Sequence, residues 1–424
     1  FHRDRPRLLY LRCRFLFLAA AGKTQQRQKQ RQSSLFHSSS ALSYYVNYIL
    51  SSPSDSVKKK HQISTIFCLY IPGRLGYTDI NKVIKGAMEE PAPEPEPIPE
   101  PVGPAGINPL TGLPMEPEYE QNRPVAVMLN NLKKAQPQLG VSMADIIYEV
   151  PAEGGITRML GVYQTLDGVG NLGSIRSARP YYIELAMGHD ALYVHAGGSP
   201  EAYQNLKSWK VDYIDGVNGS ASQSAVFWRD PERKKNKGYE HSLLASGETI
   251  QSFWDNSKYP KTHQDDYSYP QTFTDDPLTG GTAAEHIKLY YTSYKTGLFD
   301  YDAETGKYLV SQYQVPYVDG NTGEQVGVTN LLILETSISA ISGDTAGRLK
   351  VRTTGEGEGT LYRSGQCIPI HWSRSNRDVP FSYTTSDGQP LALGRGNSYV
   401  CLINPGSALF DGCFSSGTIS IISS

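Results

Sequence analysis

Residues 144–160 read ADIIYEVPAEGGITRML. The apolar and aromatic positions of 144–150 and of 156–164 predict two strands, because such side chains fit a pleated, half-buried surface. The Gly-Gly step between them is typical of a turn, since glycine adopts turn conformations without steric cost. The segment therefore predicts two strands joined by a turn, and three charged side chains lie near that turn: Glu149, Glu153 and Arg158.

Strands and helices alternate on both sides of this segment. Residues 178–187, 199–209 and 244–255 are expected to be helical, and Ser199-Pro200-Glu201 is a good helix start because Ser can cap and Pro fits the first turn. Apolar runs at 124–130 and 191–196 predict two further strands. This alternation indicates a mixed α/β domain over residues 105–275.

The pattern changes from about residue 276 onward. Short runs rich in Tyr, Val and Ile are separated by Asp-Gly, Asn-Thr-Gly and Ser-Asp-Gly turns, which is typical of antiparallel hairpins. We therefore expect a mostly antiparallel β domain over 276–405, and an α+β fold for the whole. The predicted strand runs are 286–291, 307–315, 328–335, 348–354, 367–373 and 398–403.

The segments outside these two domains have a different composition. Residues 89–104 read EEPAPEPEPIPEPVGP, and alternating Glu and Pro predict an extended linker with no apolar surface to bury. We expect residues 1–88 to be disordered or mistranslated, with a signal-like remnant in the apolar, basic-flanked run at 8–21. The tail at 406–424 is expected to be unstructured or foreign sequence.

Charge and cysteine usage exclude some function classes. Residues 1–88 carry 15 Lys and Arg against 3 Asp and Glu, whereas the two predicted domains together are mildly acidic. Because phosphate binding depends on clustered Lys and Arg, we do not expect nucleic acid as a partner. The five cysteines show no CxxC pair or metal-ligand spacing, so no metal site is expected.

Two motifs resemble ligand loops but are incomplete. Residues 168–173 fit GxGxxG, yet the next strand ends in His195 and not in the acidic residue that a dinucleotide site needs. Residues 300–306 resemble a calcium loop, but glycine is the seventh residue there and not the sixth, so a hairpin turn explains them better. The sequence therefore predicts no cofactor, and an intracellular nucleotide enzyme is disfavoured.

The charged residues of 145–241 form the candidate site. Arginines placed just before a helix start can hold an anion together with helix N–H groups. Strand ends in α/β folds reach the ligand crevice, and a further polar cluster follows at 229–241. The candidate ligand-binding residues are Glu149, Glu153, Arg158, Arg176, Arg179, His195, Arg229, Asp230 and His241. No catalytic residue is assigned.

Three interpretations of this site stay open. The first is a binding or scaffolding module for a cell-envelope component or a small anionic ligand. The second is a hydrolase of cell-wall glycan or peptide, in which Glu149 or Glu153 serves as the general acid or base. The third is a buried network of ion pairs without any ligand, since such networks also cluster charged residues.

Several long motifs of the chain resemble the YerB-like bacterial lipoproteins, a two-domain family of unknown function. The resemblance covers roughly 105–405 and implies an envelope lipoprotein held by a lipidated cysteine at the outer face of the cytoplasmic membrane. No lipobox cysteine precedes the Glu/Pro linker, so the membrane anchor is implied by the resemblance, whereas the linker and the resemblance together predict the extracytoplasmic location. Its clearest motifs are NPLTGLP at 108–114, RPVAVMLNN at 123–131, ADIIYEVPAEGGITRML at 144–160, GSIRSARPYY at 173–182, ALYVHAGGSPEAY at 191–203, GYEHSLLASGE at 238–248, YDAETGKY at 301–308, VDGNTGEQ at 318–325 and GEGEGTLYRSGQ at 355–366.

Overall fold

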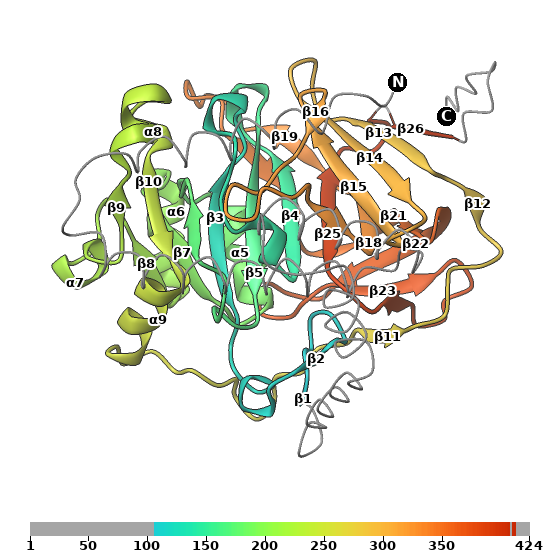
Figure 1. The fold of residues 1–424 in the computed structure, drawn as a ribbon, viewed down its shortest axis with the longest axis horizontal. Helices are drawn as coiled ribbons and strands as arrows, with labels where there is room; N and C mark the ends of the chain where they lie inside the picture. The colour runs from blue at the N-terminus through green and yellow to red at the C-terminus, as the bar shows by residue number, and fades with distance from the viewer. Residues whose placement is uncertain (1–105, 408, 413–424) are drawn as a thin grey trace, which may run out of the picture. The chain divides into compact units, whose positions relative to one another are not determined.

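An 11-stranded sheet runs through both predicted domains (Figure 1). The computed structural model describes residues 106–407 and 409–412, so the predicted leader, the linker at 89–104 and residues 413–424 lie outside the described residues. Five strands of this sheet come from the first region: β3 (Val125–Asn130), β4 (Ile146–Pro151), β5 (Thr157–Tyr163), β7 (Leu192–His195) and β8 (Tyr213–Asp215). Six come from the second: β12 (Thr282–Ala283), β18 (Asn330–Glu335), β21 (Gly355–Arg363), β22 (Gln366–Arg374), β23 (Ser382–Thr385) and β25 (Ser398–Ile403).

The two regions meet where β25 lies between β18 and β4. It runs parallel to both strands, and Cys401 is opposite Ile333 on one side and Glu149 on the other. From β4 the sheet continues through β5 and β3, which are antiparallel, to β7 and β8, which run parallel to β3. The mixed first region and the mostly antiparallel second region agree with the predicted α+β fold, and β25 is a parallel exception.

A second sheet is antiparallel and packs on the part of the large sheet that comes from the second region. Its strands are β13 (His286–Tyr290), β14 (Thr296–Asp302), β15 (Lys307–Gln312), β16 (Val315–Pro316), β17 (Gly327–Val328) and β26 (Leu409–Gly412). Ile287, Phe299 and Val310 of this sheet share one apolar core with Ile333 and Tyr399 of the large sheet. Strand β26 pairs with β13, so residues 409–412 of the predicted unstructured tail are part of a sheet.

The other face of the large sheet is covered by a different core. Tyr182 and Leu185 of helix α5 (Pro180–Gly188) and Leu206 of helix α6 (Pro200–Ser208) pack there against alternate strand residues such as Met128. Because β3 is buried on both faces, its sequence VAVML is a continuous apolar run and not an alternating one.

Shorter elements complete the described fold. The remaining helices are α7 (Ala221–Ser224), α8 (Pro231–Asn236) and α9 (Gly247–Asp255), and the single-turn helices are η1 (Pro117–Tyr119), η2 (Lys133–Ala135), η3 (Val141–Met143), η4 (Glu153–Gly155) and η5 (Tyr239–His241). The small sheets contain β1 (Gly106–Ile107), β2 (Pro114–Met115), β6 (Asn171–Gly173), β9 (Trp228–Arg229), β10 (Leu243–Ser246), β11 (Thr272–Thr274), β19 (Ile338–Ala340), β20 (Leu349–Val351) and β24 (Ala392–Gly394). Among the described residues, no helix is long and apolar enough to cross a membrane.

The helix predicted over 244–255 begins later than expected. Residues 243–246 form strand β10, and the side chain of Ser246 accepts a hydrogen bond from the backbone N–H of Thr249 to start α9. The helix predicted from Ser199 is confirmed, and the Ser199 side chain accepts a hydrogen bond from the N–H of Ala202. Both helix starts follow the same rule, because a hydroxyl oxygen satisfies an N–H that has no partner within the helix.

Candidate functional site

Strand ends from the first region gather at one edge of the large sheet. Strands β3, β7 and β8 run parallel, so their carboxyl ends at Asn130, His195 and Asp215 lie at the same edge. Arg158 near the start of β5 is opposite Asn130, because β5 is antiparallel to β3. Ligands of α/β sheets bind beyond such carboxyl ends. This edge is therefore the place to look for a site.

Three arginines and one carboxylate meet at this edge. Glu153 lies in the η4 turn and accepts hydrogen bonds from Arg158, with Nη2 to Oε1 at 2.5 Å, and from Arg179, with Nε to Oε2 at 3.1 Å. A second guanidinium nitrogen of Arg179 also binds Glu153. We call Arg158, Arg176 and Arg179 the arginine cluster. Its core is thus a half-buried Glu153 shared by two guanidinium groups.

Arg176 differs from the other two arginines in its partner. Its Nη2 lies 3.2 Å from Oε2 of Glu240, a side chain that is 63% exposed. Its buried Nε has no hydrogen-bond partner among the described residues, and the same is true of the Nε of Arg158. Exposed ion pairs contribute only about 0–1 kcal/mol, so the Glu240 partner is easily replaced. Arg176 is therefore the cluster member best able to bind a ligand.

The charges around the cluster leave a positive potential. Burial lowers the pKa of Arg158 to about 10, and the charge of Arg179 adds to the effect, so Arg158 remains charged at neutral pH. Burial lowers the pKa of His241; Glu240 opposes this, and the smaller effects of the cations Arg176, Lys134 and Arg233 add to the lowering. Around the cluster and this imidazole, cations therefore outnumber the carboxylates of Glu153 and Glu240.

Glu149, predicted for the site, lies instead in the interior. It is fully buried, and its carboxylate accepts hydrogen bonds from Asn131, Thr157 and Tyr399 at 2.5–2.8 Å. The ammonium group of Lys295, also fully buried, lies 3.1 Å from Oε1 of Glu149. Lys295 belongs to the turn between β13 and β14, so this ion pair joins the second sheet to β4. Glu149 is a structural residue and has no contact with solvent.

His195 is enclosed by aromatic rings and not by the arginines. Its ring stacks on Tyr193 at 5.2 Å between centroids and contacts Tyr203 and Tyr213. The Nδ1 atom donates to the carbonyl of Gly197 at 2.9 Å in the tautomer that this contact requires. Burial lowers the pKa of His195 although nearby Asp215 opposes the effect, so the ring is neutral at neutral pH. We therefore correct its expected role from ligand contact to packing of the strand end.

The second predicted cluster is mostly structural as well. Arg229 stacks on the ring of Tyr239, with 3.4 Å from Cζ to the centroid. Asp230 caps helix α8 by accepting a hydrogen bond from the N–H of Arg233 at 2.6 Å. His241 does reach the candidate edge, where its Nδ1 lies 3.0 Å from Nδ2 of Asn130. Arg229 and Asp230 therefore make structural contacts away from the arginine cluster, and their role in binding stays a prediction.

Sequence reasoning missed two asparagines at this edge. Asn130 ends β3 and contacts His241, and Asn131 donates to Glu149. Both directly follow a buried apolar strand, which is a signal that could have identified them. Within the described part of the chain, no group of three or more His, Cys, Asp or Glu could hold a metal ion.

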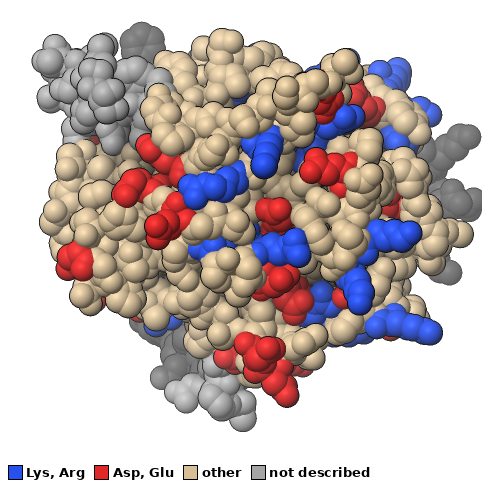
Figure 2. Space-filling model, turned by 180° about the vertical axis from the view of Figure 1, so that it is seen from behind, with Lys and Arg blue, Asp and Glu red and all other residues tan. Residues whose placement is uncertain are grey.

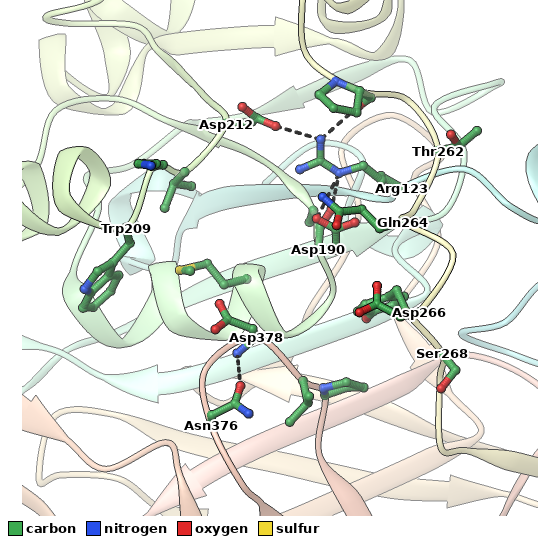
Figure 3. Close-up of a pocket in the computed structure, with 18 residues that line it drawn as sticks. Arg123, Asp190, Trp209, Asp212, Thr262, Gln264, Asp266, Ser268, Asn376 and Asp378 are labelled. Atoms are coloured by element: carbon green, nitrogen blue, oxygen red, sulfur yellow. Dashed lines mark hydrogen bonds and ion pairs between the residues drawn. The ribbon is translucent and has the colours of Figure 1, made fainter.

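A pocket lies at the opposite edge of the same strands. Three charged residues that line it come just before strands of the sheet: Arg123 before β3, Asp190 before β7 and Asp212 before β8 (Figure 3). Its volume is about 550 Å³. Its other lining residues come from the neighbours of these strands at 187–191 and 209–211, and from 260–268 and 376–380, segments with no common pattern in the sequence. On the face of the molecule in Figure 2, acidic and basic side chains are interspersed.

Comparisons with known proteins agree on one family. The family described as "Protein of unknown function (DUF3048) N-terminal domain" matches residues 110–260, and its C-terminal domain matches 287–400. The Bacillus subtilis (strain 168) protein named "Putative lipoprotein YerB" is 33% identical over 299 residues, covering 70% of this chain and 85% of that protein. The crystal structure of YerB from Bacillus subtilis matches with a TM-score of 0.63 and 30% identity, over 72% of this chain and 99% of that one.

The Lys295–Glu149 pair predicts a strong effect on stability. Replacing Lys295 with Met leaves a buried carboxylate without its cation, which we expect to lower the free energy of unfolding by about 3–5 kcal/mol. The double variant Lys295→Met/Glu149→Gln should lose less, because neither charge is then buried alone. Denaturant unfolding of both variants measures this, with Lys350→Met at an exposed position as the matched control. Equal stability of wild type and Lys295→Met would contradict the assignment.

The environment of Glu153 predicts that its contribution to the stability of the fold depends on pH. Burial alone would raise its pKa, but the hydrogen bond from Arg179 and the charges of Arg158 and Arg179 outweigh it and lower the pKa below 4.5. A carboxylate with a lowered pKa in the folded state stabilises the fold above its unfolded pKa, and this stabilisation is lost as pH falls through the folded value. The stability gap between wild type and Glu153→Gln should therefore be largest at neutral pH and shrink below pH 4.5. Exposed Glu304→Gln serves as the control, and a gap independent of pH would oppose this account.

Proposed function

The chain belongs to the DUF3048 family that includes YerB, and we propose that it is an extracytoplasmic lipoprotein that binds an anionic ligand at the arginine cluster. The family carries no established activity in its description. The binding proposal therefore depends on the chemistry of the site, and the proposed location of the protein in the cell depends in part on the relative.

Two observations support the location. The Bacillus subtilis relative carries the word lipoprotein in its name. Residues 89–104 consist largely of alternating Glu and Pro, a composition that suits an extended spacer between an anchor and a folded body. A lipid-anchored protein on the outer face of the cytoplasmic membrane would use such a spacer to hold its binding domain away from the bilayer.

The observation that carries the binding proposal is the imbalance of charge at the cluster. Arg158 and Arg179 share the carboxylate of Glu153, whereas Arg176, among the described residues, pairs only with the exposed carboxylate of Glu240. A ligand carboxylate or phosphate can replace Glu240 and gain charge-assisted hydrogen bonds in a planar, bidentate geometry. The neighbouring cations that lower the pKa of His241 add to the attraction for an anion.

The geometry does not favour the alternative of a hydrolase. A general acid needs a raised pKa near the working pH, so that it holds a proton to donate. The pKa of Glu153 is lowered, so this group is ionised at neutral pH. Glu149 is fully buried and bound by Lys295, so it cannot reach a substrate. Neither carboxyl group is suited to the acid role, and Glu153 is a poor base because Arg158 and Arg179 already bind its carboxylate. The site is therefore better suited to holding a ligand than to cleaving one.

Arg176→Ala tests the binding proposal. Binding of inorganic phosphate and of citrate, measured by calorimetry, should weaken by about tenfold, the size expected when a charged hydrogen-bonding partner is lost. The melting temperature should change little, because Glu240, its ion-pair partner, is an exposed side chain. Lys235→Ala, which removes an exposed cation from α8, is the matched control and should bind like wild type.

Arg179→Ala separates binding from structure in the same experiment. This change removes one of the two cations of Glu153, so we expect a stability loss of roughly 1.5–3 kcal/mol. If Arg176→Ala bound both anions as wild type does, or if neither anion bound wild type, the anion site would be refuted. A large loss of stability in Arg176→Ala would favour a purely structural ion-pair network.

The proposed location predicts the cell fraction in which the native gene product is found and its accessibility to protease. After fractionation, the protein should sediment with membranes and be released by detergent, because a lipid chain is its expected anchor. Protease added to intact protoplasts should digest it, as expected for the outer face. Recovery in the cytosolic fraction, without processing, would contradict the proposal.

A further inference from the structure

The pocket of Figure 3 has the dimensions of a small-ligand site. Its volume is about 550 Å³, which falls within the range of roughly 300–1,000 Å³ typical of such sites. It lies at the amino ends of β3, β7 and β8, at the edge opposite the arginine cluster. The two places therefore share strands but not residues.

Three separate parts of the chain build its walls. One wall comes from the residues just before β7 and β8, a second from the segment 260–268, and a third from the loop 376–380 of the second region (Figure 3). Apolar atoms are provided by Met187, Ala191, Val211 and Pro380. An apolar surface with polar groups around it can accept the carbon skeleton of a ligand and orient its polar substituents.

Arg123 has its charge fully engaged by the protein. Its side chain is 7% exposed, its Nη1 lies 2.8 Å from the carboxylate of Asp212, and its Nε lies 3.2 Å from that of Asp190. Two carbonyls, those of Asp190 and Pro260, accept further hydrogen bonds from it at 2.7 and 2.9 Å. Arg123 therefore holds the wall together and offers little positive charge to a ligand.

Two further aspartates remain available. Asp266 and Asp378 line the pocket from different loops, both are exposed, and neither carboxylate has an ion pair among the residues that the structure describes (Figure 3). With Asp190 and Asp212, the lining has four acidic side chains against the basic Arg123 and Lys210. The pocket therefore has an excess of negative charge, opposite in sign to the arginine cluster.

We propose that this pocket binds a small ligand with a protonated amine and a hydroxyl-bearing carbon skeleton. Asp266 and Asp378 accept charge-assisted hydrogen bonds from the ammonium group. The side chains of Gln264 and Ser268 bind hydroxyl groups, and the apolar wall contacts the carbon atoms of the ligand. An anionic ligand is disfavoured here because the lining carboxylates repel it.

A matched pair of probes tests the charge. The β-1,4-linked glucosamine disaccharide carries ammonium groups, whereas its di-N-acetylated form has the same hydroxyl groups and no charge. By calorimetry at low ionic strength, the first should bind wild type at least about tenfold more tightly than the second, as expected when a charged hydrogen bond is lost. The preference should shrink as salt is added, because the aspartates are exposed.

Variants place the effect in the pocket. The double variant Asp266→Asn/Asp378→Asn should bind the amine probe about tenfold more weakly, with little change in melting temperature, because both carboxylates are exposed and Asp378 has only a longer-range attraction to Arg374. Asp265→Asn removes a neighbouring exposed carboxylate that does not line the pocket, and it should bind like wild type. Arg176→Ala should also bind the amine normally, so this test and the test of the anion site fail independently.

Three results would overturn the proposal. They are equal binding of the two disaccharides, no binding of the amine form to wild type, and unchanged binding in the double aspartate variant. A weaker amine affinity in Asp265→Asn as large as that in the double variant would also overturn it, since it would indicate general attraction by surface charge.

Discussion

The parallel pairing of β25 with β4 is the contact on which the rest of the structure depends. It joins the strands of the second region to those of the first, and it places Cys401 opposite Glu149. Glu149 then meets Tyr399 of β25 and Lys295 of the second sheet in the interior. A buried charge pair is tolerated only with good geometry and further hydrogen bonds, so these contacts restrict the position of β4. The η4 turn follows directly, and with it Glu153 is held where Arg158 and Arg179 can bind it.

Local sequence patterns predicted most elements but not their neighbours in space. The runs at 124–130, 144–150 and 156–164 are all present as strands, because apolar runs of this length adopt few other secondary structures. The run at 398–403 was predicted within a set of hairpins, yet it lies between two strands that are far from it in the chain. Strand β21 was missed because glycine is disfavoured in strands. Here Gly357 is required by packing, since a Cβ at this position would lie 2.7 Å from Trp372.

Only one aspect of the candidate site could be predicted, namely which residues lie near the ends of strands. Spacing indicated that Arg158 and the arginines before α5 would approach Glu153, and the structure brings Arg158 and Arg179 to it. The face on which a charged side chain lies depends on packing, which spacing does not reveal. Glu149 and Glu153 are four residues apart, yet one is buried under the second sheet and the other borders the solvent. The pocket was not predictable, because loops from three parts of the chain form it.

The two proposed sites lie at opposite ends of the same strands. Arg123 closely precedes β3 and lines the pocket, whereas Asn130 ends β3 near the arginine cluster. Six residues of strand span about 20 Å, so a small ligand at one edge cannot touch the other. Coupling between the sites would have to pass through β3, which is buried and close-packed on both faces. Such a strand moves as part of a rigid sheet and not by itself. The opposite charges of the two edges therefore favour independent recognition of two ligands, or of two oppositely charged groups on one extended ligand.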